Sequence, residues 1–301
     1  MKTLTPTGRL EASLYRRPTP PPPRAIEGLR LEDIANVEAL RQGWLKVRAN
    51  KGGSGGDGVT IDLFARQVDD HLIRLESALL KGSYWPRQLR LTCIPKANGG
   101  MRTLSIPAVE DRVVQSTLLL ALAPLLDPHM SDASCAYRPG RGVKDAVERV
   151  RQGFAAGFEW TVEADIASYF DSVPHARLVD ELTIWIDDER VINLISLWLR
   201  RFSVRGRGIA QGSPISPLLA NLYLHPVDRL LVVRGYRVVR YADDLVVQAR
   251  SEADVVAARK QLEQVLAARG LSLNAAKTQI VAPTKDFTFL GQQLSARHKP
   301  Q

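Results

Sequence analysis

Two adjacent carboxylates lie between two strongly β-forming runs in the last third of the chain. Tyr236–Arg240 and Leu245–Val247 are rich in apolar and β-branched residues, and Ala242, Asp243 and Asp244 stand between them. Two such runs joined by a short polar segment predict a β-hairpin with both acids at its tip. Aspartate is also a common turn residue because its side chain bonds to nearby backbone, so the pair alone leaves a plain turn open.

A third acid upstream stands in a similar setting. The apolar run Trp160–Ala164 predicts a buried strand that ends at Asp165. A strand end beside the hairpin tip would bring three carboxylates together, and clustered carboxylates repel one another unless a cation lies between them. Hard divalent cations prefer oxygen ligands, so the cluster predicts a pair of Mg²⁺ ions, with Mn²⁺ as a substitute, and phosphoryl transfer. For Asp165 alone, a turn or helix-cap role stays open.

The overall charge agrees with a nucleic-acid partner. The 301 residues include 41 Lys and Arg against 32 Asp and Glu, a net charge of +9, as expected of a chain that binds polyphosphate. Cys93 and Cys135 are too few and too far apart for a zinc site or a disulfide framework, which favours a reducing cytoplasm. The longest apolar stretch, Val113–Leu126, is interrupted and too short to span a bilayer, so no membrane role is expected.

The N-terminal region divides into three segments. Residues 1–25 contain the proline run Arg17–Arg24 and are expected to be an extended tail, either a stiff spacer or a docking ligand for a partner. Leu31–Val47 has helical apolar spacing. The Gly-rich, basic loop Lys51–Gly58 follows, and it is either a plain linker or a strip that lies along a phosphate backbone.

A second hairpin is predicted in the next part of the chain. Leu89–Ile94 and Met101–Ile106 read as strands joined by a turn at Asn98-Gly99-Gly100. This hairpin would place Lys96 and Arg102 near each other. Two cations at a hairpin tip suit a triphosphate, Arg through bidentate contacts and Lys as a point charge, although two solvated surface charges are the alternative.

Taken in order, the motifs of this chain resemble those of the reverse transcriptases of group II introns and their bacterial relatives. The resemblance runs from about Trp44 to Gly291. It rests on Asn50-Lys51-Gly52-Gly53 with Gly56-Asp57-Gly58, Ile94-Pro95-Lys96 with Gly99-Gly100-Met101-Arg102, Ala136–Gly142, Asp165–Asp171, Gln211–Pro217, Tyr241–Asp244, Leu273–Lys277 and Phe289-Leu290-Gly291.

The resemblance implies an α+β right-hand polymerase fold of fingers and palm, with an antiparallel palm sheet backed by helices. An N-terminal extension and the fingers would occupy residues 26–150, and the palm with the catalytic carboxylates residues 151–301. The implied activity is RNA-directed DNA polymerase, which extends a primer 3′-hydroxyl with deoxynucleotides. Asp165, Asp243 and Asp244 would be catalytic and, together with Ile166, would hold the metal ions.

The resemblance also implies roles for residues around the acids. Phe170 reads as core from its spacing alone, whereas the matching family position excludes ribonucleotides. The nucleotide would be bound by Lys96, Arg102, Phe170 and Gln211. The template and primer, an RNA template with a DNA or RNA primer, would contact Lys51, Arg138, Gly212, Ser213, Pro214, Lys277 and Gly291.

Four secondary-structure expectations complete the palm. A helix is expected at Leu218–Leu224 and an amphipathic helix behind the sheet at Glu252–Arg269. Asp171 is expected to cap a helix that begins near Pro174. Phe287–Gly291 is expected to be a strand that closes the palm.

Only ten residues follow Gly291, whereas family members continue into a helical thumb, which is expected to be absent here. This favours an enzyme that depends on a protein partner for thumb-like or adaptation functions, in a CRISPR-associated or another bacterial defence setting. A shortened intron-encoded protein, a catalytically silent nucleic-acid-binding scaffold and a metal-dependent nuclease are the alternatives.

Overall fold

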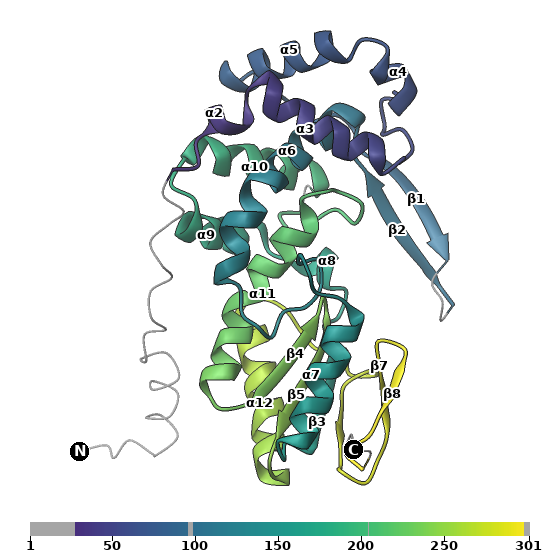
Figure 1. Ribbon diagram of the computed structural model, residues 1–301, viewed down its shortest axis with the longest axis vertical. Helices are drawn as coiled ribbons and strands as arrows, with labels where there is room; N and C mark the ends of the chain where they lie inside the picture. Colours follow the sequence, from purple (N-terminus) through teal and green to yellow (C-terminus); the bar gives the residue numbers. More distant parts are fainter. Residues whose placement is uncertain (1–27, 96–98, 204, 298–301) are drawn as a thin grey trace, which may run out of the picture.

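The computed structural model describes residues 28–95, 99–203 and 205–297. The expected tail of residues 1–25 and the predicted triphosphate contact Lys96 lie outside the described residues. Figure 1 shows a helical upper lobe, from which one long hairpin projects, above a lower lobe built around a sheet.

The upper lobe is a group of helices packed on one long central helix. Its elements are α2 (Leu31–Ile34), α3 (Val37–Ala49), α4 (Ile61–Ala65), α5 (Val68–Leu80) and α6 (Val109–Leu126). The single helix expected at 31–47 is two helices, because Asn36 lies outside the helix and its side chain accepts a 2.8 Å bond from the Ala39 N–H to cap α3. At Gly43, α3 packs so closely on α6 that an added Cβ would lie 2.6 Å from the Val113 carbonyl oxygen.

The predicted second hairpin is present. Strands β1 (Arg90–Pro95) and β2 (Met101–Ile106) pair antiparallel, with Arg102 opposite Ile94. Most of their residues are exposed, and the hairpin extends away from the helices on the right of Figure 1. At its root, the Ser105 N–H donates to the Gln211 carbonyl at 2.7 Å, which ties the hairpin to the lower lobe.

The other helices are η1 (Asp127–His129), α7 (Val143–Ala155), α8 (Tyr169–Ser172), α9 (His175–Trp185), α10 (Glu189–Phe202), α11 (Ser216–Val233) and α12 (Glu252–Ala268). Of these helices, α7, α11 and α12 pack on the sheet, and α9 and α10 lie above it. The helices expected at Leu218–Leu224 and Glu252–Arg269 are thereby confirmed. Within the described ranges, no helix combines the length and the apolarity needed to cross a bilayer.

The expected cap at Asp171 is wrong. A helix does begin beside Pro174, but its N-cap is Pro174 itself and no side chain caps it. Asp171 instead lies within the short helix α8.

The lower lobe is built on a four-stranded antiparallel sheet. Its strands are β3 (Trp160–Asp165), β4 (Arg237–Tyr241), β5 (Asp244–Ala249) and β6 (Gln279–Val281), in the spatial order β4-β5-β3-β6. Both the predicted strand and the predicted acid-bearing hairpin are therefore confirmed.

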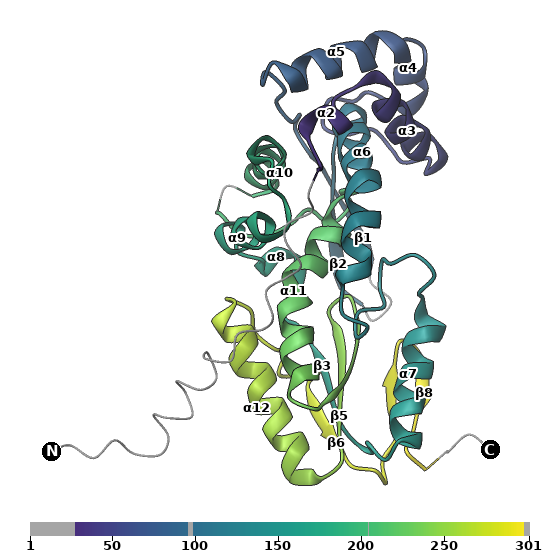
Figure 2. The same ribbon diagram turned by 60° about the vertical axis from the view of Figure 1, so that its left-hand side comes forward.

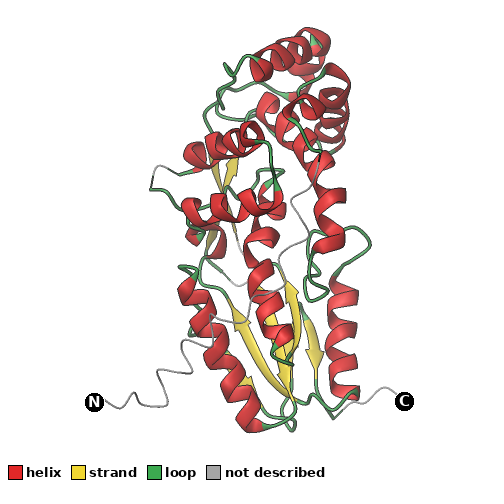
Figure 3. Ribbon diagram, turned by 90° about the vertical axis from the view of Figure 1, so that its left-hand side faces the viewer, coloured by secondary structure: helices red, strands yellow, loops and turns green. Residues whose placement is uncertain are grey.

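Helices cover both faces of this sheet. Successive strand residues point to opposite sides, and apolar residues occupy both sides here. Val238 and Val247 belong to the main core with α11 and α12, whereas Val239 and Val246 pack with α7 in a second cluster. Figures 2 and 3 show the sheet between these helices. The boundary expected between residues 150 and 151 falls inside α7.

A short separate hairpin follows the palm sheet. Strand β7 (Phe287–Phe289) pairs with β8 (Gln292–Leu294) and not with the palm sheet, so the expected closing strand is shorter and has a different partner. Leu290 and Gly291 form its turn with φ of 52° and 77°, the two positive values that a type I′ turn requires.

Candidate active site

The sheet register brings the two acid-bearing segments together. Asp165, the last residue of β3, lies directly opposite Asp244, the first residue of β5, and such cross-strand neighbours have Cβ atoms about 4.5–5.5 Å apart. The Ile166 N–H donates to the Asp243 carbonyl at 3.2 Å. Asp165, Asp243 and Asp244 therefore gather at one end of the palm sheet, as expected from the sequence.

A tight turn presents the adjacent acids. Tyr241 pairs with Asp244, so Ala242 and Asp243 are the two central residues of the β4–β5 hairpin. Ala242 has a φ of 58°, the left-handed region that alanine disfavours because its Cβ crowds the backbone. Beside the turn, Asp165 and Asp244 line a pocket of about 270 Å³ together with Lys277.

The two aspartates of the turn have raised pKa values. Burial, followed by the charge of Asp165, raises the pKa of Asp243. Burial, followed by the charges of Asp243 and Asp165, raises the pKa of Asp244 to about 6. Both shifts show that negative charge is unfavourable here without a cation.

Lys277 supplies one cation. Its ammonium donates a hydrogen bond to the Asp165 Oδ2 atom, and this bond is the main cause of the raised pKa of Lys277. One ammonium against three carboxylates leaves the site with an excess of negative charge when all three are ionised.

The donor chemistry fits divalent metal ions, although the side chains are not arranged as a closed metal site. Carboxylate oxygens are the ligands that Mg²⁺ and Mn²⁺ prefer. Over the described residues, no three carboxylate, imidazole or thiol groups already converge on one metal position. Lys277 occupies one oxygen of Asp165, the Oδ2 atom.

The β1–β2 hairpin directs a cation toward the acids. Arg102 on β2 lies close enough to Asp243 to oppose, after Lys277, the rise in the pKa of that carboxyl group. Its neighbour in the predicted triphosphate site, Lys96, lies outside the described residues. Of the two residues predicted to bind the triphosphate, Arg102 is therefore close enough to interact electrostatically with the carboxylates.

The loop Gln211–Pro214 connects the hairpin to α11. The Gln211 carbonyl accepts the bond from the Ser105 N–H noted above. Gly212 has a φ of 115°, and a Cβ added there would lie 3.1 Å from the Ser105 carbonyl oxygen. The buried Ser213 hydroxyl donates to Gln115 Oε1 at 2.9 Å. Ser213 and Gly212 therefore shape the loop, and the contacts of Gln211, Gly212, Ser213 and Pro214 with nucleotide or template stay predictions.

Arg138 is held inside the protein. Its guanidinium donates to the Asp127 carboxylate at 2.6 Å and to backbone carbonyls of Asp127, Ser131 and Ser134 at 2.8–3.0 Å. Its side chain is 5% exposed. The structure gives Arg138 a structural role, and its contact with template or primer stays a prediction.

The remaining predicted residues lie around the acids and on the lobes above and beside them. Phe170 is half-buried and meets Tyr169 edge to face with ring centroids 5.8 Å apart. Ile166 is fully buried next to Asp165. Lys51 is exposed at the end of α3, and Gly291 is exposed at the tip of the β7–β8 hairpin. No contact within the chain tests their predicted roles.

Two residues near the acids were not singled out from the sequence. Tyr137 has a φ of 61° and is partly exposed. Its partial burial, and then the charges of Asp243 and Tyr241, raise its pKa, which places its phenol beside the acid turn. Arg240 is fully buried beneath the turn. The sequence could have indicated this burial: residues two positions apart on a strand point to the same face, and Val238, two residues before Arg240, points into the core.

Known proteins are similar to this chain in sequence and in fold. A family model described as reverse transcriptase (RNA-dependent DNA polymerase) matches residues 94–294. Protein YkfC of Escherichia coli is 31% identical over 286 residues, covering 80% of this chain and 75% of YkfC. The group II intron-encoded protein LtrA of Lactococcus lactis is 30% identical over 192 residues, covering 61% of this chain and 32% of LtrA.

A solved structure shows the same fold at low sequence identity. Telomerase from Candida albicans, in complex with a fragment of telomeric RNA, superposes with a TM-score of 0.52 and 13% identity over 76% of this chain and 50% of the telomerase chain. The chain thus spans most of YkfC, about a third of LtrA and half of the telomerase chain.

Proposed function

Because the chain belongs to the reverse transcriptase (RNA-dependent DNA polymerase) family, we propose that Asp165, Asp243 and Asp244 form the centre that extends a primer 3′-hydroxyl with deoxynucleotides along an RNA template. The observation that carries this proposal is the register of β3 against β5, which sets Asp165 opposite Asp244. Carboxylates that are far apart in the sequence thereby meet at one end of the two inner strands of a buried sheet.

The three carboxylates, with the backbone of Ile166, would hold two Mg²⁺ ions, or Mn²⁺ in their place. When bound, such ions activate the attacking hydroxyl and stabilise the leaving phosphate oxygen. The protein's own contribution is to fix the carboxylates on strand ends, so that reactants are aligned by a rigid frame. Lys277, once released from Asp165, would be free to pair with a phosphate of the primer or template.

The nucleotide would be held between the β1–β2 hairpin and the palm. Arg102, with Lys96, would neutralise the triphosphate. Phe170 lies five residues after Asp165 on α8, and its ring would exclude a 2′-hydroxyl by bulk. Gln211 would line the floor beneath the new base pair.

Template and primer would be bound mainly through their phosphates, so their affinity should fall steeply with salt concentration. The residues proposed for this contact are Lys51, Arg138, Gly212, Ser213, Pro214, Lys277 and Gly291. We place the protein in the cytoplasm, with a protein partner that completes the grip on the duplex. Its setting in CRISPR-associated adaptation, in another defence system or in an intron is a prediction.

The experiment is primer extension with the intact chain on an RNA template annealed to a DNA primer. Matched reactions would replace the RNA template with DNA, the deoxynucleotides with ribonucleotides, and Mg²⁺ with a chelator. We expect extension on RNA with deoxynucleotides and metal, and little with ribonucleotides. A folded protein that binds the duplex in a fluorescence anisotropy assay but extends no primer on either template would instead support the scaffold alternative.

A further inference from the structure

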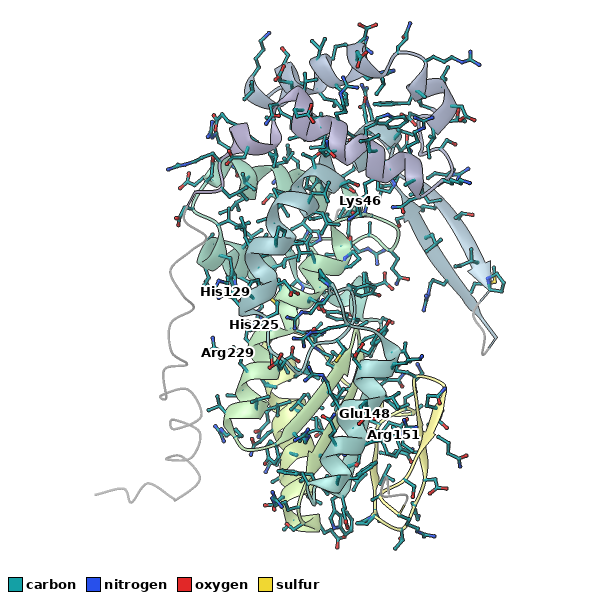
Figure 4. The ribbon with its side chains drawn as sticks, in the orientation of Figure 1. Lys46, His129, Glu148, Arg151, His225 and Arg229 are labelled. Atoms are coloured by element: carbon teal, nitrogen blue, oxygen red, sulfur yellow. The ribbon has the colours of Figure 1, made fainter. Side chains whose placement is uncertain are left out.

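A fully buried arginine lies directly beneath the acid turn. Arg240 is the fourth residue of β4, three positions before Asp243, and none of its surface is exposed. Its Nε and one terminal nitrogen donate to the two carboxylate oxygens of the equally buried Asp228, on α11, at 2.8 and 2.7 Å. Figure 4 locates α11 through its labelled residues His225 and Arg229.

The remaining donors of Arg240 reach three other groups. The terminal nitrogen that bonds to Asp228 also donates to the Ser134 hydroxyl at 2.9 Å. The other terminal nitrogen donates to Asn221 Oδ1 at 3.0 Å and to the Ala242 carbonyl at 3.1 Å. A guanidinium has five N–H groups, and five acceptor contacts are present. The arginine is therefore fully satisfied in one fixed orientation.

One of these bonds holds the turn that carries the acids. The Ala242 carbonyl belongs to the peptide group that leads into Asp243, and Ala242 has the disfavoured φ of 58°. Left-handed backbone costs an alanine about 1–2 kcal/mol, so the surrounding contacts must hold it. The next carbonyl, that of Asp243, accepts from Ile166, which links the turn to the residue after Asp165.

The same network also fixes the segment beside the turn. The Asn221 side chain, which accepts from the guanidinium, donates to the Ala136 carbonyl at 2.8 Å, and the backbone N–H of Arg240 donates to the Ala133 carbonyl at 2.7 Å. Ala136 precedes Tyr137, whose ring lies near Asp243. Arg240 and Asn221 thus bind both backbone segments that border the acids.

Stability alone does not account for this arrangement. Burying two charges is costly, and replacing a buried ion pair by apolar residues of similar volume is often neutral or stabilising. A guanidinium that reaches a backbone carbonyl of the acid turn does something an apolar side chain cannot, because it fixes the direction of a peptide group.

We propose that Arg240, held by Asp228 and Asn221, is a positioning residue that orients the Ala242–Asp243 turn so that the carboxylates are placed to bind divalent metal. The inference rests on the proposed function, since it assumes that Asp165, Asp243 and Asp244 are the metal ligands. Groups that orient metal ligands typically change metal affinity by about 10–100-fold when removed.

The test measures the binding of Mn²⁺ alone to the full chain, with electron paramagnetic resonance used to quantify the ion that stays free. The first variant combines Arg240→Met with Asp228→Leu, so that no lone charge is left buried. The second, Arg240→Lys, keeps a cation beside Asp228 but lacks the reach to all five acceptors. We expect Mn²⁺ affinity to fall about ten-fold in both variants, with circular dichroism that shows a folded chain.

A matched control removes another ion pair that lies away from the turn. Arg269 and Glu181 are joined at 2.7 Å with side chains 16% and 14% exposed. The pair Arg269→Met with Glu181→Leu should leave Mn²⁺ affinity at the wild-type value, whatever its effect on the melting temperature. A general loss of stability would affect this control as much as the Arg240 variants.

Two results would overturn different statements. Wild-type Mn²⁺ affinity in either folded Arg240 variant overturns the positioning role. Wild-type Mn²⁺ affinity in a chain with Asp243→Asn and Asp244→Asn overturns the proposed function, because the metal would then bind elsewhere. If the double variant does not fold, Arg240→Lys decides the matter alone.

Discussion

Two hairpins contribute charges to the proposed active site, and they are supported in opposite ways. The β4–β5 hairpin lies inside a sheet covered on both faces, with most of its residues buried. The β1–β2 hairpin is mostly exposed and pairs only with itself. The carboxylates are thus held in place by a hydrophobic core. Arg102 instead lies on the β1–β2 hairpin, here called the arm, whose position depends on the contacts at its root, where it joins the rest of the molecule.

This difference separates two tasks. Groups that hold metal and align reactants need precise placement, which a buried sheet provides. A cation that meets a nucleotide entering from solvent needs exposure instead. Variants in the sheet should therefore alter the rate of the chemical step, and variants in the arm should alter nucleotide binding.

The largest expected effect comes from the sheet. Asp165→Asn should slow primer extension at least about a hundred-fold, because loss of a metal ligand removes several kcal/mol of transition-state stabilisation. Single-turnover extension at saturating nucleotide measures this. Glu163→Gln removes a carboxylate from the same strand and should change the rate only a few-fold. Equal effects of the two variants would contradict a specific role for Asp165.

A smaller effect is expected at the root of the β1–β2 hairpin. Asp111 on α6 is buried and accepts bonds from the Tyr84 hydroxyl at 2.6 Å and the Arg87 N–H at 2.9 Å, and Trp198 on α10 donates to the same hydroxyl at 3.0 Å. Burial is the main cause that raises the pKa of Asp111 from 3.8 to about 7. This buried network joins the arm to the body of the molecule.

The sign of the pH dependence follows from that shift. A raised pKa means that the folded chain binds the proton more tightly than the unfolded chain, so the stability from Asp111 is complete below pH 3.8 and is lost as pH rises through 7. The free energy of unfolding should fall by roughly 1–4 kcal/mol more between pH 5 and pH 8 in the wild type than in Asp111→Asn. Urea unfolding measures it, with the exposed Asp62→Asn as control. Parallel pH profiles for wild type and Asp111→Asn would refute the linkage.

Packing in the upper lobe gives the next effect. Gly43→Ala should destabilise the chain by about 1–2 kcal/mol, because the new methyl group meets the backbone of α6, and overpacking outweighs the roughly 1 kcal/mol that alanine gains in a helix. Thermal unfolding would report it, and the exposed neighbour change Gln42→Ala should be nearly neutral. A Gly43→Ala protein more stable than the wild type would contradict this prediction, because α3 and α6 would then have moved apart to accommodate the methyl group at little cost.

The smallest effect is expected on the arm itself. Arg102→Ala should raise the KM for deoxynucleotide about ten-fold while kcat changes little, since a charge-assisted phosphate contact at an exposed position contributes about 1.5 kcal/mol, the lower end of the usual range. Steady-state kinetics measures both constants. Arg74→Ala, a change of the same charge on α5, should leave both constants unchanged. A loss confined to kcat would place Arg102 with the sheet residues and would remove the contrast between the two hairpins.

Much of this architecture could be predicted from local sequence. The strand Trp160–Asp165, both hairpins and the helix after Ser251 follow from alternation, turn residues and helical spacing. The acids were predictable as a group because each stands at the end of a β-forming run. Local patterns of this kind carry their own structural information, and tertiary contacts did not override them.

The contacts beneath the site were not predictable in the same way. Lys277 bonds to Asp165 across 112 residues, and Arg138 turns inward to Asp127 rather than toward solvent. Arg240 finds its partner Asp228 on a helix that precedes its strand. Such pairings depend on which elements the fold places side by side, and no local pattern contains that information.

The most direct test of the central claim is RNA-templated primer extension by a chain with Asp243→Asn and Asp244→Asn. The matched control, Asp69→Asn with Asp70→Asn, changes another adjacent aspartate pair on α5. We predict that the intact chain and the control extend the primer with deoxynucleotides and Mg²⁺, and that the Asp243 and Asp244 variant does not. Extension by that variant at the intact rate would contradict the assignment of the acid turn as the catalytic centre.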